Sequence, residues 1–195
     1  VRRFGAAQGR VLERGAFPNR RFTLEKGDVV ALLGQTDIVR SRQDGTLESL
    51  LTLEYASAGP RFRNLAFEGD TVGEQWRDLN FGRWRDQLAA VGASVVFAQF
   101  GQAELIAEDA LAEDGLATEG GLEPFIEDYE ALLDEIESQT ARVVLVSPRP
   151  FETPATSLPH FPDHTEKNAE LERRVAAVAT VAARRGFVFV DLFMA

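Results

Sequence analysis

The sequence predicts an α/β fold, with a five-stranded parallel sheet and helices on both of its faces. The first observation is a set of five short apolar runs, which is typical of strands buried on both faces. The second is that helix-like segments separate these runs, as parallel strands require. The third is that 195 residues, 45% hydrophobic and 27% charged, are ordinary for a single soluble globular domain.

The strands and helices follow from local pattern. Apolar runs predict strands over 28–34, 61–66, 94–100, 141–147 and 186–192. Apolar residues at helical spacing, bounded by glycine and proline, predict helices over 45–56, 83–91, 122–139 and 165–185. The segment 122–139 is the most strongly amphipathic, and its many acidic residues are explained as a solvated outer face.

Three segments are expected to lack regular structure. Residues 1–27 form an irregular N-terminal extension, which leaves 28–195 as the domain proper. The acidic stretch 103–120 is predicted to be a surface excursion. Residues 148–162 hold five of the eight prolines, which predicts a long irregular loop.

Charge and composition exclude several classes of partner. The formal net charge is −10, so the surface repels phosphate backbones and anionic lipid headgroups, and neither nucleic acid nor a membrane is an expected partner. The absence of cysteine excludes disulfides and thiolate chemistry. No apolar run approaches the roughly 18 residues of a membrane span. Phosphate-binding and zinc-protease motifs are absent, and no cofactor is predicted.

Polar residues and glycines follow the predicted strands, where ligands bind in open α/β sheets. The relevant segments are Gly34-Gln35-Thr36-Asp37, Asn64-Leu65-Ala66-Phe67-Glu68-Gly69-Asp70-Thr71, Gly101-Gln102-Ala103-Glu104 and Ser147-Pro148-Arg149-Pro150.

Together these segments resemble the SGNH, or GDSL, hydrolase superfamily of esterases, lipases, acetylhydrolases and thioesterases. The resemblance covers about residues 27–193, and its most specific part is the Asn-x4-Gly-Asp-Thr element at 64–71 with its Phe-Arg-Asn-Leu lead-in. It implies a flavodoxin-like three-layer α/β/α sandwich. It also implies ester hydrolysis by a serine nucleophile, with oxyanion donors from a glycine and an asparagine and a base from an Asp-x-x-His block.

Carried over position by position, the resemblance places Thr36 at the nucleophile and Gly69 at the backbone oxyanion donor, with Asn64 matching the asparagine that precedes that glycine. Ala103 stands where the family has its oxyanion asparagine, so Gln102 is the neighbouring side chain that can take over only by turning inward. The residues expected to line the site nearby are Gly34, Gln35, Asp37, Asp70, Gly101 and Glu104.

These positions depart from the family in two ways that affect chemistry. Threonine keeps a hydroxyl, but its extra methyl restricts its rotamers and crowds the line of attack. Alanine has no donor, and loss of one oxyanion donor typically costs a factor of about 10²–10³ in rate.

The base is the largest gap, because an alcohol is a weak nucleophile without one. The sequence stops at Ala195, before the position of the family's Asp-x-x-His block and of the helix that follows it, which leads us to expect a piece of a longer protein. His160, His164 and Asp163 lie in the proline-rich loop and are candidates to replace the base. The favoured interpretation is that Asp163 or Thr165 caps the following helix and both histidines are surface residues.

Two further sites have weaker support in the sequence. Asp37, Asp70 and Glu104 are three carboxylates that Mg²⁺ or Ca²⁺ would accept, but no spacing motif supports a metal site, and Glu104 is better explained as holding its loop by hydrogen bonds. Trp76 and Trp84 have the chemistry to stack on a sugar ring, and packing is the alternative.

Two functional hypotheses follow. The favoured one is a non-catalytic domain that serves as a ligand-binding or interaction module beside other domains of a longer chain. The alternative is a divergent carbohydrate or lipid esterase with Thr36 as nucleophile and a base from beyond Ala195. The partner expected in both is a carbohydrate or another ester-bearing small molecule. The family resemblance and a first residue that is not Met give the further expectation of an exported protein.

Overall fold

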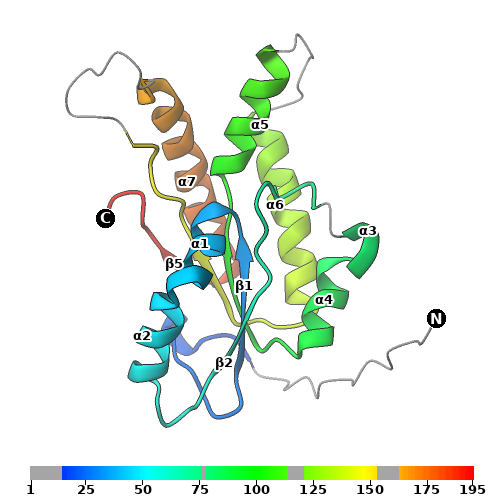
Figure 1. Cartoon of the computed structure of the whole chain (residues 1–195), viewed down its shortest axis with the longest axis vertical. Coiled ribbons are helices and arrows are strands. Elements are labelled where there is room, and N and C mark those ends of the chain that lie inside the picture. The colour runs from blue at the N-terminus through cyan, green and yellow to red at the C-terminus, as the bar shows by residue number, and fades with distance from the viewer. Residues whose placement is uncertain (1–14, 76–77, 114–120, 153–162) are drawn as a thin grey trace.

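One parallel sheet organises the molecule. The computed structural model describes residues 15–75, 78–113, 121–152 and 163–195 (Figure 1). Within these ranges the strands lie in the order β2-β1-β3-β4-β5, and every neighbouring pair is parallel. Their bounds are β1 Val29–Gly34, β2 Arg61–Asn64, β3 Val95–Gln99, β4 Val143–Val146 and β5 Val188–Val190. Because the order reverses between β1 and β3, the loops after these two strands diverge and leave a crevice.

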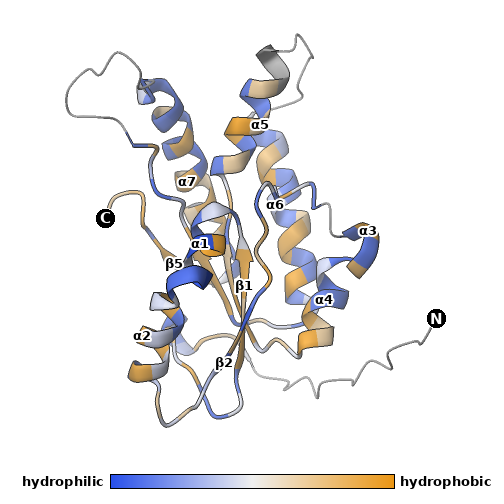
Figure 2. Ribbon diagram, in the orientation of Figure 1, coloured by the Kyte–Doolittle hydropathy of each residue, from blue (hydrophilic) through white to orange (hydrophobic). Residues whose placement is uncertain are grey.

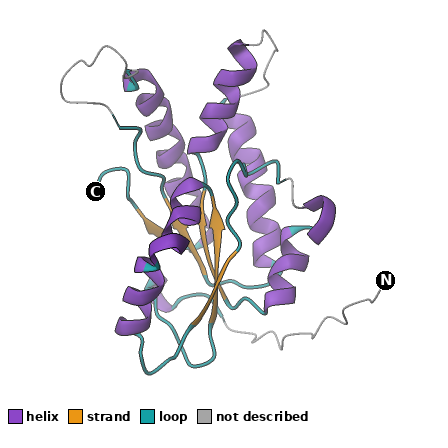
Figure 3. Ribbon diagram, in the orientation of Figure 1, coloured by secondary structure: helices purple, strands orange, loops and turns teal. Residues whose placement is uncertain are grey.

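Helices cover both faces of the sheet, which confirms the predicted α/β/α arrangement (Figure 3). In the described part of the chain they are α1 Thr36–Asp44, α2 Thr46–Glu54, α3 Asp78–Phe81, α4 Trp84–Val91, α5 Gln102–Glu113, α6 Leu122–Glu137 and α7 Thr165–Arg185, with a short 3₁₀ turn at Pro18–Arg20. Helices α4, α6 and α7 pack on one face. The other face carries α1, α2 and the segment that precedes β1.

The core has two parts because side chains alternate along each strand. On β3, Val96 and Ala98 face the cluster under α4, α6 and α7. Val95 and Phe97 face the cluster under α1 and α2. The central strands are accordingly apolar from Val29 to Leu33 in β1 and from Val95 to Ala98 in β3, and β1 is orange in Figure 2.

A buried ion pair joins the residues that directly precede β1, β3 and β4, at the end of the sheet where these strands begin. Arg142, just before β4, donates from Nη1 to both carboxylate oxygens of Asp28, at 2.8 and 2.9 Å. The Asp28 carboxylate also accepts from Ser94 Oγ, at the start of β3. Both charged side chains are nearly inaccessible to water. The Phe17 ring lies against the guanidinium, which ties the segment before β1 to this edge.

One element prediction was wrong, and two helices were not predicted. Residues 102–113 form helix α5, where a surface excursion was expected; residues 114–120 lie outside the described ranges. Helices α1 and α3 lie at 36–44 and 78–81, for which no helix was predicted. In α1 and α5 the apolar stripe is short, so tertiary contacts and not periodicity decide the conformation.

The tryptophan prediction has a clear outcome for one residue. Trp84 is buried in the cluster under α4 and α6, so it packs the core and does not present a stacking surface. Trp76 lies outside the described residues.

Candidate functional site

The site begins where β1 meets α1. Gly34 ends β1 with φ +141°, a conformation that favours glycine, and a Cβ at this position would lie 2.4 Å from the Gln99 carbonyl oxygen. Glycine at position 34 therefore allows the end of β1 to approach β3 closely. Gln35 and Thr36 follow at once, so the start of α1 is held directly above the two central strands.

A buried hydrogen-bond network joins the first and third site segments. The Gln35 side chain donates from Nε2 to Glu104 Oε2 at 2.7 Å and accepts from the Ala103 backbone N–H at 3.0 Å. Both side chains are buried. Gln35 is thus bound at both ends of its amide, and it fixes α1 against the start of α5.

Glu104 holds the surrounding loops, as expected. Besides Gln35, its carboxylate accepts from the backbone N–H groups of Gly101 and Val72, at 2.8 and 2.9 Å. Burial raises the pKa of Glu104 above its ordinary value although these hydrogen bonds act in the opposite direction. The Tyr129 hydroxyl is buried nearby, and its pKa is raised by burial and then by the Glu104 charge.

Thr36 is half-buried, and its hydroxyl is already engaged. Oγ1 donates to Glu68 Oε2 at 2.8 Å, which joins α1 to the loop after β2. Glu68 was not singled out from the sequence. It lies 32 positions from Thr36, directly before Gly69, and only the folded chain brings the two together. Gly69 itself is exposed, with φ +82°.

Asn64 positions the loop and does not point its amide into open space. Its Nδ2 donates to the Ile38 carbonyl at 2.8 Å, and its Oδ1 accepts from the Ala66 N–H at 3.1 Å. The loop after β2 is also bound to the end of β1 through Phe67 N–H and the Gly34 carbonyl. Asn64 therefore sets where Glu68 and Gly69 lie.

An ion pair joins α1 to the loop after β4. Arg149, after β4, donates from Nε and Nη2 to the two carboxylate oxygens of Asp37, at 3.1 and 2.6 Å. The Asp37 carboxylate raises the pKa of Arg149 above its ordinary value. Gln102 donates to the Arg149 carbonyl at 3.1 Å, so its amide is turned toward the β4 loop.

A hollow of about 380 Å³ opens beside these groups. Thr36 lies at one side of it, and the residues that line it include Asp37, Arg40, Gln102, Arg149, Phe151 and Glu152. Hydroxyl, amide, carboxylate and guanidinium groups converge here around one aromatic ring. Such a set is suited to binding a polar ligand.

Neither described base candidate contacts Thr36. The His164 ring packs against Phe151 with centroids 5.2 Å apart. Asp163 accepts from both the backbone N–H and the hydroxyl of Thr165, at 2.9 and 2.6 Å, where α7 begins. These hydrogen bonds lower the pKa of Asp163. The contacts agree with the capping interpretation, and His160 lies outside the described residues.

The carboxylates considered for a metal are separately engaged. Asp37 is paired with Arg149, Glu104 accepts hydrogen bonds from Gln35 and backbone amides, and Asp70 is buried. Thr71 caps the next turn by accepting from the Glu74 N–H. Among the described residues, no three histidine, aspartate or glutamate side chains are grouped so that they could hold a metal ion. None of the described helices is long and apolar enough to cross a membrane.

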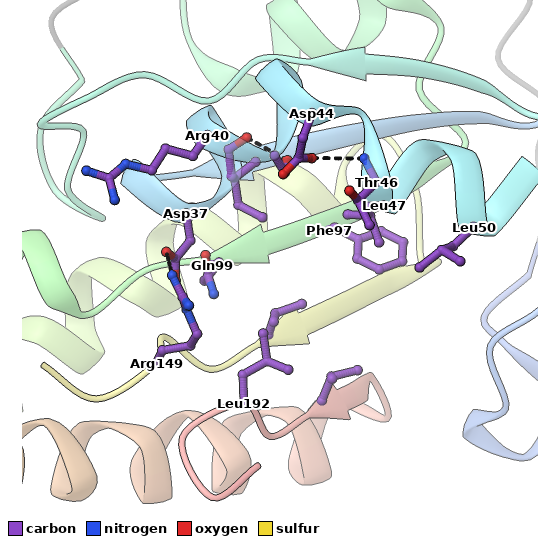
Figure 4. Close-up of a pocket in the computed structure, with 14 residues that line it drawn as sticks. Asp37, Arg40, Asp44, Thr46, Leu47, Leu50, Phe97, Gln99, Arg149 and Leu192 are labelled. Carbon is purple, nitrogen blue, oxygen red and sulfur yellow. Dashed lines mark hydrogen bonds and ion pairs between the residues drawn. The ribbon is translucent and has the colours of Figure 1, made fainter. Parts of the chain in front are cut away.

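A second, larger hollow adjoins the first. It has a volume of about 560 Å³ and is lined by residues of α1, α2, β3, β4 and β5 and of the segments that follow β4 and β5. Figure 4 shows Asp37 and Arg149 together at one end of this hollow and Leu50 at the other.

Known structures share this fold. No family model matches the sequence, and no curated protein matches it significantly. Among solved structures, the acetylxylan esterase Axe2 from Geobacillus stearothermophilus is 18% identical with a TM-score of 0.66, over 89% of this chain and 80% of that one. LAE5, an alpha/beta hydrolase enzyme from the metagenome of Lake Arreo, Spain, is 20% identical with a TM-score of 0.59, over 87% and 79%.

A gut microbial diltiazem-metabolizing enzyme is 17% identical with a TM-score of 0.63; the match spans 90% of this chain but only 39% of that enzyme's length. The chain therefore has a fold found in esterases and other hydrolases. At these identities the similarity concerns the fold and carries no activity.

Proposed function

We propose that this chain is a non-catalytic, hydrolase-fold domain that binds a ligand in the hollow beside Thr36 as a module of a larger protein. One observation carries the proposal: no oxyanion donor comes from the third site segment. Ala103 has a methyl where a donor is needed, and its backbone N–H already donates to Gln35. The neighbouring Gln102 amide is directed to the Arg149 carbonyl.

The expected increases in the activation barrier favour a domain without ester-hydrolase activity. A missing oxyanion donor typically raises the barrier by about 3–4 kcal/mol. The Glu68 carboxylate adds a negative charge next to the place where an oxyanion would form, and such a charge about 4 Å away costs about 1 kcal/mol in a water-like environment and about 4 kcal/mol near a less solvated surface. Both effects oppose a tetrahedral intermediate, and the missing donor is the larger because Glu68 is exposed.

The ligand proposed for this module is polar and hydroxyl-bearing. Glu68, Gln102 and Arg149 supply acceptors and donors around the Thr36 hydroxyl, and Phe151 supplies an apolar face. Sugars combine such hydroxyls with apolar ring faces. The acetylxylan esterase among the structural neighbours makes an ester-bearing carbohydrate the first class to examine.

The contact between Thr36 and Glu68 is the observation that favours a second candidate, a divergent ester hydrolase. A carboxylate 2.8 Å from the hydroxyl accepts its hydrogen bond and is placed to take its proton during attack. In that case Thr36 is the nucleophile, with either Glu68 or a residue from beyond Ala195 as base.

Labelling with a fluorophosphonate, read by intact mass, tests the proposal. Because the second candidate can take its base from beyond Ala195, both this chain and a version continued past Ala195 are treated. We expect no adduct on either protein, nor on the Thr36→Ser variants, since removing the methyl does not restore a donor. A Thr36→Ala variant is the matched control. An adduct that forms on the parent and disappears in Thr36→Ala would overturn the proposal in favour of the hydrolase.

A further inference from the structure

The larger hollow belongs to an apolar face of the molecule that is open to water. Phe97 of β3, Val146 of β4 and Val190 of β5 line it from the sheet, and Leu50 lines it from α2. Val190 is 37% exposed and Leu50 is 61% exposed. Burial of such apolar surface against another apolar surface lowers the free energy. Exposed apolar patches of this kind mark interaction sites.

Helix α2, beside the hollow, is rich in leucine on two sides. Four of its nine residues are leucine, and none of these is buried. Leu47 and Leu51 pack partly against the core. Leu50 and Leu53 are 61% and 75% exposed, and their spacing of three positions puts them on one side of the helix. A surface helix normally turns its apolar residues to the core, so this second apolar side points to a partner.

The edge of the sheet on this side lacks the charges that guard the opposite edge. Strand β2, at one edge, exposes Arg61 and Arg63. Charged side chains on an edge strand hinder association with another chain. Strand β5, at the other edge, consists of two valines and a phenylalanine and has no charged residue. The β5 side of the molecule, next to the hollow, is therefore the side suited to meet a second chain.

The charges of this face favour a second copy of the same chain. The hollow is lined by Asp37, Arg40, Asp44 and Arg149, which balance although the chain has a formal charge of −10. Asp37 and Arg149 are paired, and Asp44 accepts from a backbone N–H. Exposed Arg40 and exposed Glu54, one helical turn beyond Leu50, have no ion-pair partner among the described residues. One copy thus offers both a cation and an anion to the other.

We propose that this face is the interface of a two-fold symmetric dimer, in which Leu50 and Leu53 of each copy cover the hollow of the other. Arg40 and Leu50 lie at opposite ends of the hollow (Figure 4). A two-fold axis across its middle exchanges these ends, so Arg40 of each copy meets Glu54 of the other.

The size of the face fits this assignment. The hollow is lined by 14 residues, and the outer side of α2 adds to them. Each partner in a stable interface of standard size contributes roughly 20–30 residues, which this face approaches. The inference goes beyond the proposed ligand binding beside Thr36 and does not rest on it.

Sedimentation velocity from low to high micromolar concentration tests the dimer. Leu50→Gln should raise its dissociation constant at least about tenfold, because the substitution enters a two-fold interface twice. The matched control is Leu79→Gln, in helix α3, which is 82% exposed and packs beside α4 on the other side of the sheet. It should change the constant less than about twofold. Circular dichroism checks that both variants keep the parent's fold.

Charge reversal tests the pairing of the two copies. Arg40→Glu and Glu54→Arg should each weaken the dimer about three- to tenfold, and the double variant should return to within about twofold of the parent. Glu54→Arg lowers the net negative charge of the chain, so general repulsion between copies cannot explain weakening by this variant.

Several results would overturn the dimer. A monomer at every concentration would do so, and so would a dimer that Leu79→Gln weakens as much as Leu50→Gln. A double variant no stronger than the single reversals would exclude this two-fold arrangement. The version continued past Ala195 should dimerise as well. If it is monomeric where this chain dimerises, its own additional residues cover the face. None of these results changes the reading of the fluorophosphonate labelling, which tests the proposed function separately.

Discussion

At the scale of single residues, the buried Glu104 carboxylate has a structural role, because it holds neighbouring segments by hydrogen bonds. It is buried in the first turn of α5 and accepts from one side-chain amide and two backbone N–H groups of other residues. Burial nevertheless dominates, so the pKa of Glu104 is raised from its ordinary 4.5. The folded protein therefore holds a proton at pH values where the unfolded chain has released it.

This linkage has a definite sign. Above pH 4.5 the unfolded chain loses the Glu104 proton first, so the contribution of Glu104 to folding stability declines as pH rises, until its raised pKa in the folded protein has been passed. Glu104→Gln cannot titrate and lacks this decline. We therefore expect the difference in free energy of unfolding, parent minus Glu104→Gln, to fall over that interval. Urea unfolding of both proteins from pH 4 upward measures it, and a difference that rises or stays level would contradict the assignment.

Gly34 sets the distance between the two central strands. Gly34→Ala should destabilise the fold by at least about 2 kcal/mol more than Gly45→Ala, the matched control. Both glycines have positive φ, but a Cβ at Gly34 meets the Gln99 carbonyl at 2.4 Å, while one at Gly45 meets nothing within 4 Å. Thermal and urea denaturation of the two variants give the comparison. Equal losses would mean that β1 moves away from β3 at little cost.

At the scale of elements, predictability followed the length and strength of the apolar pattern. Helix α7 occupies the predicted range 165–185, and every strand falls within its predicted run. Helix α1 has only Ile38 and Val39 buried, so its sequence pattern is typical of a polar loop. Helix α5 is rich in acidic residues and was mistaken for a loop for the same reason. Short polar helices are held by their neighbours, and a single sequence does not show those neighbours.

The stability of the fold should depend strongly on the buried ion pair between Arg142 and Asp28, at the end of the sheet where the strands begin. Arg142→Met leaves the Asp28 carboxylate buried with its cation removed, and we expect a loss of about 3–5 kcal/mol in the free energy of unfolding. Arg61→Met, at an exposed position of β2, is the control, with an expected change within about 0.5 kcal/mol. Chemical denaturation distinguishes them. A loss in Arg142→Met no larger than the control would show that water reaches Asp28.

At the scale of the whole molecule, the candidate site is assembled from segments that are distant in sequence. Thr36 and Glu68 are 32 positions apart, Gln35 and Glu104 are 69 apart, and Asp37 and Arg149 are 112 apart. The sequence predicted that the loops meet, because parallel strands bring their carboxyl ends to one edge. It did not predict which side chains pair, since pairing depends on rotamers and on loop paths. Neither Glu68 nor the larger hollow lined by α1, α2 and the sheet was predicted, for this reason.

Stability should decrease from the centre of the sheet to its edges. Strands β1 and β3 are buried on both faces, whereas β5 is an edge strand on which Val190 is 37% exposed. Native-state hydrogen exchange should therefore find the amides of β1 and β3 opening only with global unfolding, and those of β5 and β2 opening earlier. Protection in β5 equal to that in β3 would indicate that another chain or segment covers this edge.

The hydrogen bonds of the Gln35 amide also constrain which substitutions this site can accept during evolution. One side chain occupies both the Glu104 carboxylate and the Ala103 N–H. Replacing Gln35 alone leaves the half-buried Ala103 N–H without its acceptor and removes one of the three hydrogen bonds that Glu104 accepts from Gln35, Gly101 and Val72. Changes at these positions should be strongly non-additive, each harmful before the other is made. A lineage that holds this bridge would therefore change Gln35 or Ala103 only through less stable intermediates.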